Sequence, residues 1–180
     1  FADADIEAAL PVLINAVVQH AGQTCSAGSR LLVERKAYDH IVSRVAERFA
    51  SVRAGTPEMD LDLGPVVSLR QQQRVRGFFE RAAADGVPVI AEGQVAAGVP
   101  ENGFFVQPKL YGPVPRANSL ANDEVFGPVM AVLPFDDEAD AVALANATKY
   151  GLVAGVWTRD AQRAVRVARR MQVGQVFVNC

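Results

Sequence analysis

The sequence predicts an α/β protein, with three αβα layers around a mostly parallel sheet. Apolar runs of strand length alternate with segments of helical periodicity roughly 10 to 18 residues long, which is typical of parallel sheets covered by helices. The chain has 180 residues, of which 50% are hydrophobic and 21% are charged. A chain of this size and composition buries enough surface to fold without a disulfide or a structural metal. We therefore expect residues 1–180 to form one domain.

Two helices separated by a short strand are predicted at the start of the chain. Apolar residues recur every three or four positions over residues 6–17, after Asp3 and Asp5, either of which can cap the first turn. A short β-prone run at residues 31–33 then precedes a second helical pattern over residues 38–49.

A third helix has the clearest boundaries. Ser68 and Gln71 have the form of a capping box, in which two side chains bond the backbone of the first helical turn. The apolar pattern continues to Gly86, and glycine readily adopts the left-handed conformation that ends many helices. We expect a helix between these two signals.

Strands and helices alternate through the rest of the chain. Each predicted strand is a short apolar run bounded by proline or glycine, and each predicted helix follows an aspartate that can cap it. The predicted strands cover residues 87–90, 104–106, 129–133 (between Pro128 and Pro134), 152–157 and 175–178. The predicted helices follow Asp136 or Asp137, continuing through Val142 and Leu144, and Asp160, ending before Gly174. Residues 92–103, rich in glycine and alanine, are predicted to form a long loop.

Charge and hydropathy exclude two classes of function. Eighteen lysines and arginines stand against twenty acidic residues, for a net charge of -2, and no basic block is present. This balance disfavours nucleic-acid binding. The longest apolar stretch, residues 6–18, is interrupted by Pro11 and Asn15 and is shorter than the ~20 apolar residues that cross a bilayer. We expect neither a nucleic-acid partner nor a membrane partner.

The cysteines and the chain start bear on where the protein works. Cys25 and Cys180 lie at opposite ends of the chain, unlike the disulfide framework of a small secreted protein, so we expect a reducing, cytoplasmic location. No histidines and cysteines have the paired spacing of a zinc site, so we expect no metal. The chain begins at Phe1 rather than methionine and without a signal-peptide pattern, so we expect it to be part of a longer protein.

The common phosphate-binding glycine motifs are missing. No two of the 14 glycines are two positions apart, which excludes a G-x-G-x-x-G turn. Gly93 and Gly98 have the spacing of a Walker loop, but Val99 follows where a lysine is required. If the protein binds a dinucleotide, another segment holds its phosphates.

Cys25 lies in a run of small residues, GQTCSAGSR, from Gly22 to Arg30. Small neighbours leave room for a substrate, and a nearby cation such as Arg30 would raise the fraction of nucleophilic thiolate. Composition alone favours the other interpretation, a buried cysteine that packs as a small hydrophobic residue. His20 is open to two interpretations, as the base of a Cys–His hydrolase or as a side chain that packs at a helix end.

The GQTCSAGSR segment resembles the active-site cysteine signature of the NAD(P)-dependent aldehyde dehydrogenase superfamily. Other segments resemble stretches of that family in the same order: FADAD at residues 1–5, GFFVQP at 103–108, EVFGP at 124–128, YGL at 150–152, AGVWT at 154–158 and GQVFVN at 174–179. The resemblance spans the whole chain, which corresponds to less than half of a full-length family member.

The resemblance implies roles for five residues. Cys25 would be the nucleophile, with its own N–H helping to stabilise an oxyanion, and Thr24 and Ser26 would lie beside the substrate pocket. Glu124 would accept hydrogen bonds from the ribose hydroxyls on the nicotinamide side of the coenzyme. Phe126 would lie near the nicotinamide ring. Without the resemblance, Glu124 is one member of a solvated acidic pair and Phe126 is an ordinary core residue.

The resemblance also implies the reaction and its partners. An aldehyde would be oxidised to a carboxylate with NAD or NADP, through a thiohemiacetal and a thioester on Cys25. The full-length protein would be a homodimer or homotetramer. The coenzyme-binding and oligomerisation segments, a general-base glutamate and a second oxyanion donor, an asparagine, are expected outside residues 1–180, so the isolated chain should be a poor enzyme. A CoA-acylating or phosphate-releasing relative with the same cysteine, and a non-catalytic interaction module, remain alternatives.

Overall fold

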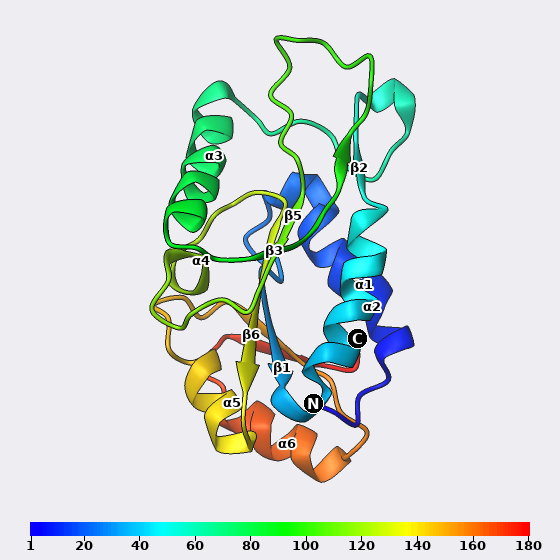
Figure 1. The fold of residues 1–180 in the computed structure, drawn as a ribbon. Helices are drawn as coiled ribbons and strands as arrows, with labels where there is room; N and C mark the ends of the chain where they lie inside the picture. Colours follow the sequence, from blue (N-terminus) through cyan, green and yellow to red (C-terminus); the bar gives the residue numbers. More distant parts are fainter.

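The computed structural model describes residues 1–180 and contains the predicted alternation of helices and strands (Figure 1). The six α-helices are α1 (Ile6–Val18), α2 (Tyr38–Ala50), α3 (Leu69–Ala84), α4 (Ser119–Asn122), α5 (Glu138–Ala145) and α6 (Ala161–Arg170). The eight strands are β1 (Arg30–Glu34), β2 (Arg53–Ala54), β3 (Val89–Glu92), β4 (Gln94–Val95), β5 (Lys109–Tyr111), β6 (Val129–Phe135), β7 (Val153–Val156) and β8 (Gln175–Val178). None of the helices is both long enough and apolar enough to span a bilayer.

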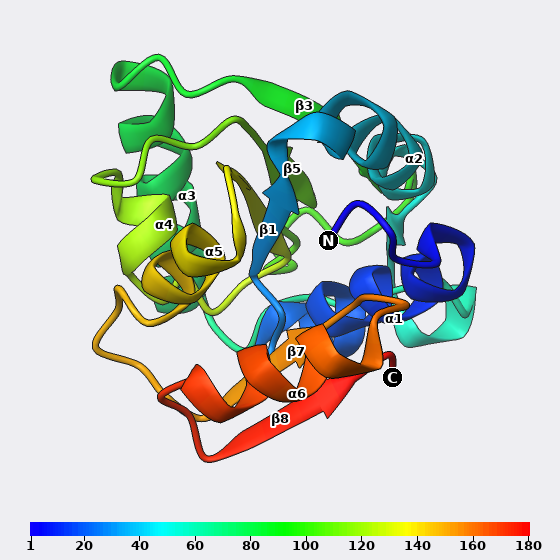
Figure 2. The same ribbon diagram turned by 90° about the horizontal axis from the view of Figure 1, so that it is seen from below.

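The central sheet confirms the predicted fold class. Its four strands lie in the order β1-β6-β5-β3, with β6 parallel to both β1 and β5, and β3 antiparallel to β5. Helix α2 covers one face, while α3, α4 and α5 lie on the other (Figure 2). Apolar side chains from both sides fill the core, among them Phe49 of α2 and Leu110, Met130 and Leu133 of the sheet.

Aspartate and serine side chains begin the helices as the sequence predicts. Asp5, rather than Asp3, caps α1 by accepting a hydrogen bond from the Ala8 N–H. Asp137, rather than Asp136, caps α5, and Asp160 caps α6. Each cap satisfies an N–H that the first helical turn would otherwise leave without a partner.

The strand expected at 129–133 extends through Pro134, so proline does not end it there. The Ala131 N–H donates to the Ser29 carbonyl at the β1 side, and alternate residues of a strand point the same way. The Pro134 nitrogen therefore faces the other side. There β5 pairs only with residues Val129 to Ala131 of β6, so no neighbouring strand needs an N–H at position 134.

Two other strand predictions differ from the structure: one strand begins later than predicted and the other does not form. The strand expected at 87–90 begins at Val89, because the Val87 N–H closes the end of α3 on the Ala82 carbonyl and Pro88 has no N–H. The strand expected at 104–106 does not form. The carbonyls of Phe104 and Phe105 accept hydrogen bonds from the Val66 N–H and the Gln72 side chain, and pairing begins at Lys109.

The predicted loop at residues 92–103 holds a short strand. Gln94 and Val95 form β4, which pairs in parallel with β2, a strand that the sequence pattern does not predict. The two strands form a two-stranded sheet separate from the central one. Glu92 ends β3, so the loop prediction is correct for Gly93 and for the residues after Val95.

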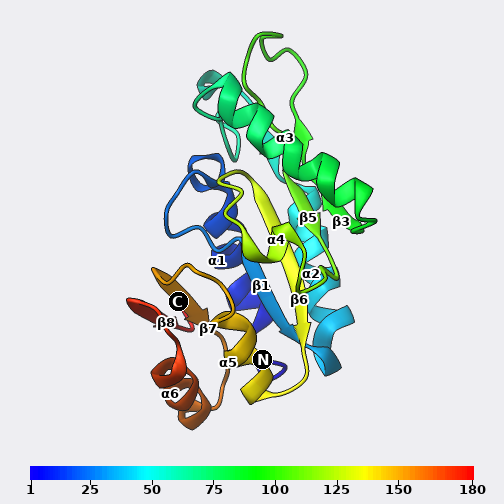
Figure 3. The ribbon, with the colours of Figure 1, turned by 90° about the vertical axis from the view of Figure 1, so that its left-hand side faces the viewer.

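The C-terminal elements form a separate layer beside the central sheet (Figure 3). Strands β7 and β8 pair in parallel, and a small apolar cluster of Val142, Val156 and Val167 joins α5, β7 and α6. The other edge of β8 has no strand partner, and Phe177 in this strand is 40% exposed. The pattern predicts β8 correctly, but it joins β7 rather than the main sheet.

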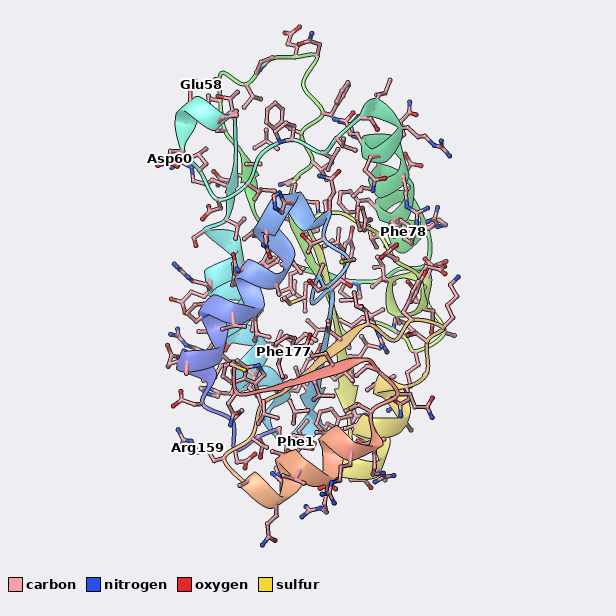
Figure 4. All side chains as sticks on the ribbon, turned by 180° about the vertical axis from the view of Figure 1, so that it is seen from behind. Phe1, Glu58, Asp60, Phe78, Arg159 and Phe177 are labelled. Atoms are coloured by element: carbon pink, nitrogen blue, oxygen red, sulfur yellow. The ribbon has the colours of Figure 1, made fainter.

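Asp3 links the start of the chain to the start of α6 through hydrogen bonds. Its carboxylate accepts hydrogen bonds from the Thr158 hydroxyl at 2.7 and 2.9 Å, from the N–H groups of Arg159 and Asp160, and from the Arg163 guanidinium at 2.9 Å. Phe1 and Arg159 consequently lie at the same end of the molecule (Figure 4). Burial by itself raises the pKa of Asp3, but the Thr158 hydrogen bond and the charge of Arg163 outweigh it and lower the pKa.

Asp3→Asn should lower the free energy of unfolding by about 2 kcal/mol at neutral pH, because it removes a charged acceptor that serves several donors. A group with a depressed folded-state pKa stabilises above its unfolded pKa and loses that contribution as the pH falls through the folded value. The difference between wild type and variant in urea unfolding should therefore shrink as the pH falls below the ordinary pKa of 3.8. Glu101→Gln, at an exposed carboxylate without a partner, is the control and should change little. A pH-independent difference between Asp3→Asn and wild type would contradict the assignment.

Candidate active site

The loop after α1 turns the chain sharply and presents Cys25. Three successive residues, His20, Ala21 and Gly22, have positive φ angles of 49°, 55° and 73°. A turn then follows, closed by a hydrogen bond from the Ala27 N–H to the Thr24 carbonyl. Cys25 and its neighbour at position 26 occupy the two central positions of that turn, so the thiol lies on the surface.

The predicted substrate-pocket residues flank the thiol. Ser26 is exposed and Thr24 is half-buried, and the Thr24 hydroxyl donates to the Gln19 carbonyl at 3.5 Å. Cys25 is a free, exposed cysteine, and no hydrogen bond within the chain uses its N–H. Within residues 1–180, Cys25 is therefore not packed as a buried hydrophobic residue.

Arg30 and His20, which the sequence offers as a cation and a base for the thiol, make their contacts elsewhere. Arg30 donates to the carbonyls of Leu144 and Ala145 at the end of α5, where burial lowers its pKa, so its guanidinium is committed to that helix. His20 is exposed and makes no hydrogen bond to Cys25, so the structure contains no Cys–His pair. Cys180 is also exposed, so accessibility does not separate the two thiols.

The EVFGP segment from Glu124 to Pro128 forms a second turn, between α4 and β6, which bends at Gly127 and Pro128 and exposes only Glu124. The Glu124 side chain is exposed and makes no hydrogen bond or ion pair within the chain, whereas its neighbour Asp123 lies 3.6 Å from Lys149. Val125 is buried, and Phe126 is half-buried with a positive φ of 58°. The carboxylate at 124 is thus free to accept hydrogen bonds from a ligand.

Two glycines bring these turns together. A Cβ atom on Gly22 would lie 2.0 Å from the carbonyl oxygen of Gly127, closer than any real contact. A Cβ on Gly127 would in turn lie 2.6 Å from the side chain of Val75 on α3. Only residues without side chains allow the two backbones to approach this closely. The cysteine motif and the EVFGP motif, distant in sequence, are therefore neighbours in the fold.

Helix α3 supports both turns. The Gln71 side chain donates to the carbonyls of Val125 at 3.3 Å and Phe126 at 2.7 Å, and Arg74 donates to the Glu124 carbonyl at 2.5 Å. Just before the helix, the Val67 N–H donates to the side chain of Gln23 at 2.9 Å. The helix therefore contacts the backbone of the EVFGP motif, and the residue Val67 that precedes it contacts a side chain of the cysteine motif.

The capping-box prediction is only half correct. Ser68 accepts a hydrogen bond from the Gln71 N–H at 3.2 Å, as expected, but the Gln71 side chain reaches the EVFGP turn instead of the Ser68 backbone. The sequence signal thus places Gln71 at a helix start and misses its contact with the site. A polar residue spaced three after a cap gave no hint of a partner 55 positions away.

A hollow lies beside Asp123, the residue before Glu124. Its volume is about 450 Å³, and its lining includes Arg74, Phe78, Arg81, Lys149 and Tyr150. The Arg81 guanidinium lies 4.3 Å from the centre of the ring of Phe78, the residue of α3 that is labelled in Figure 4. The Glu124 N–H donates to the Tyr150 hydroxyl oxygen at 3.2 Å. No group of three or more histidine, cysteine or acidic side chains is arranged to hold a metal ion.

Similarity to a known family extends over the whole chain. The sequence model of the aldehyde dehydrogenase family matches residues 1–180. The chain belongs to the aldehyde dehydrogenase family. Within this aldehyde dehydrogenase chain, the glycine contact joins the two segments that resemble the family's cysteine and coenzyme motifs.

Relatives and solved structures cover this aldehyde dehydrogenase chain almost completely. A betaine aldehyde dehydrogenase of Cereibacter sphaeroides is 40% identical over 180 residues, which are 99% of the chain and 37% of the relative. A Burkholderia cenocepacia structure classed as an aldehyde dehydrogenase has a TM-score of 0.98 and 56% identity, covering 99% of this chain and 38% of that one. A Mycobacterium tuberculosis aldehyde dehydrogenase complexed with NAD+ has a TM-score of 0.93 and 34% identity, covering 99% and 37%. The chain thus spans less than two fifths of the length of these proteins.

Proposed function

We propose that the protein containing this chain oxidises an aldehyde to a carboxylate with NAD or NADP, using Cys25 as the nucleophile. The observation that carries the proposal is the contact of Gly22 with Gly127, which brings the exposed thiol loop beside the turn that bears Glu124. Residues 1–180 would form the catalytic domain, and the coenzyme-binding and oligomerisation segments would lie elsewhere in a homodimeric or homotetrameric protein. The names of the relatives make betaine aldehyde the first substrate to test.

Cys25 begins the reaction. After it loses its proton, the thiolate sulfur bonds to the aldehyde carbon, and the carbonyl electron pair moves onto oxygen to give a thiohemiacetal oxyanion. The Cys25 N–H has no partner within the chain and would donate to that oxygen. Thr24 and Ser26 flank the sulfur and would line the path of the substrate.

The groups around Glu124 fit the nicotinamide side of a dinucleotide. A carboxylate without an internal partner can accept hydrogen bonds from two adjacent ribose hydroxyls, and the half-buried Phe126 offers an apolar surface near the ring. When bound, NAD or NADP supplies the acceptor for the hydride that leaves the tetrahedral carbon. Glu124 and Phe126 would fix the distance between that acceptor and the carbon held on Cys25.

Loss of hydride leaves a thioester on Cys25, and an activated water then releases the carboxylate. The base for that water would come from a segment outside residues 1–180. A CoA-acylating or phosphate-releasing enzyme would use the same thioester with a different acceptor, and no residue of this chain favours those acceptors. Product analysis with and without CoA and phosphate separates the three reactions.

Glu124→Gln should slow hydride transfer about tenfold, because a neutral amide accepts weaker hydrogen bonds from the ribose and holds it less firmly. Stopped-flow measurement of reduced coenzyme formation in the full-length protein reports this rate. Formation of the thiohemiacetal should change less, since the thiol is intact. Asp123→Asn alters the neighbouring carboxylate, which pairs with Lys149, and serves as the control. An unchanged rate of hydride transfer in Glu124→Gln would remove Glu124 from the site.

A further inference from the structure

Helix α3 carries positive charge that the chain itself does not pair. It contains a single glutamate and four arginines: Arg70, Arg74, Arg76 and Arg81. None of these arginines forms an ion pair within the chain, whereas Arg163 and Arg166 of α6 pair with Glu138 at 3.8 and 2.9 Å. The arginines of α3 are therefore available to an anion from outside the chain.

Two of these arginines, Arg74 and Arg81, line the hollow of about 450 Å³. Arg74 donates to the Glu124 carbonyl and is already used there. The Arg81 side chain makes no hydrogen bond, and its guanidinium lies 4.3 Å from the centre of the Phe78 ring (Figure 4). It folds back over Gly77, where a Cβ atom would lie 3.4 Å from a guanidinium nitrogen. The ring thus supports a cation whose N–H groups remain free.

A second cation reaches the hollow from a different segment. Lys149, in the loop between α5 and β7, lines the hollow together with Tyr150. The Lys149 ammonium lies 3.6 Å from the Asp123 carboxylate and 5.4 Å from the centre of the Tyr150 ring. Both partners of that ion pair are exposed, so water weakens their attraction. Asp123 is the only acidic residue among the lining residues, which include three cations, so the hollow attracts anions.

We propose that this hollow binds a small organic phosphate, with the phosphate group between Arg81 and Lys149. A phosphate carries nearly two negative charges and accepts hydrogen bonds from both a guanidinium and an ammonium. The volume lies within the range of about 300–1,000 Å³ that is usual for small-molecule sites. Tyr150 is 45% exposed, and its ring offers a surface to the organic part of the ligand. Arg81 belongs to the last turn of α3, and the binding does not depend on the proposed aldehyde oxidation.

Saturation-transfer NMR with phenyl phosphate tests the proposal in the full-length protein, with saturating NAD+ present to occupy the coenzyme site. Binding should be saturable at constant ionic strength. Arg81→Gln and Lys149→Gln should each weaken it about tenfold, because each removes a charged donor. Gly77→Leu keeps every charge but fills the hollow, and it should weaken binding to a similar extent. Leucine favours a helix more than glycine does, and Lys149 lies in an exposed loop, so these variants should fold.

Arg76→Gln is the matched control, because Arg76 is exposed on the same helix, has no ion pair and lies outside the hollow. It should leave the affinity within about twofold of wild type. Benzoate, with the same ring and a single charge, should bind at least about threefold more weakly than phenyl phosphate. Inorganic phosphate should displace phenyl phosphate with a lower affinity, since it lacks the ring. Equal affinities would overturn the contact of the organic group with Tyr150.

Four other results would overturn the proposal. The first is the absence of saturable binding. Loss of binding with NAD+ present would place phenyl phosphate in the coenzyme site instead. Equal weakening by Arg76→Gln and Arg81→Gln would reduce the effect to the net charge of α3. Unchanged binding in Gly77→Leu would place the ligand outside the hollow.

Discussion

Cys25→Ala should reduce aldehyde oxidation by the full-length protein by at least ~10,000-fold, because the variant has no atom that can bond to the aldehyde carbon. Alanine fits the same exposed turn, so the backbone and the neighbouring glycine contact should not change. Coenzyme affinity, measured by fluorescence titration, should stay within about threefold of wild type because the thiol acts after binding. A complete loss of turnover together with intact coenzyme binding is the expected result.

Cys180→Ala is the matched control for that experiment. Cys180 is the only other cysteine in the chain, and it is likewise free and exposed. The same substitution there should leave turnover within about twofold of wild type, since the side chain lies outside the two motifs. Turnover near the wild-type level in Cys25→Ala would refute covalent catalysis by this residue.

Gly22→Ala should damage both stability and activity, because the added Cβ atom would meet backbone atoms rather than a movable side chain. The Gly127 carbonyl oxygen would be 2.0 Å away and the Gly127 carbonyl carbon 2.2 Å away, so one of the two turns must shift. The positive φ of 73° adds a conformational cost for any residue with a Cβ. We expect unfolding to be easier by about 3–5 kcal/mol. We also expect turnover to fall about 100-fold, because a displacement of one ångström between reacting groups has effects of that size.

Two other glycines separate the steric clash of the added Cβ atom from the conformational cost of a positive φ. Gly86 has a φ of 66° but open space around its α-carbon, so Gly86→Ala measures the conformational cost alone, about 1 kcal/mol. Gly64 has open space and no positive φ, and Gly64→Ala should be close to neutral. Urea unfolding of the three variants should give the order Gly22, Gly86, Gly64 from largest to smallest loss. Equal losses at Gly22 and Gly86 would contradict the close contact between the two motifs.

Local patterns in the sequence were sufficient for most of the secondary structure. Apolar residues at helical spacing and the caps at Asp5, Ser68, Asp137 and Asp160 act within a few positions of each helix, so the sequence alone located α1, α3, α5 and α6 closely. The strands were harder. Pairing decides where a strand begins, and the N–H of Val87 and the carbonyls of Phe104 and Phe105 find partners outside the sheet. Periodicity does not report such partners.

Cys25, Glu124 and Phe126 were singled out by the resemblance of two short motifs to a known family, and such motifs can be read from the sequence because their residues are adjacent along the chain. The tertiary structure decided how those motifs meet. It committed Arg30 to the end of α5, left His20 without a bond to the thiol, turned the Gln71 side chain toward Phe126, and brought Gly22 against Gly127. A local motif specifies residue types and their spacing. These contacts instead join residues 50 or more positions apart, and only the packing of α3 and the turns around the sheet brings such residues within bonding distance.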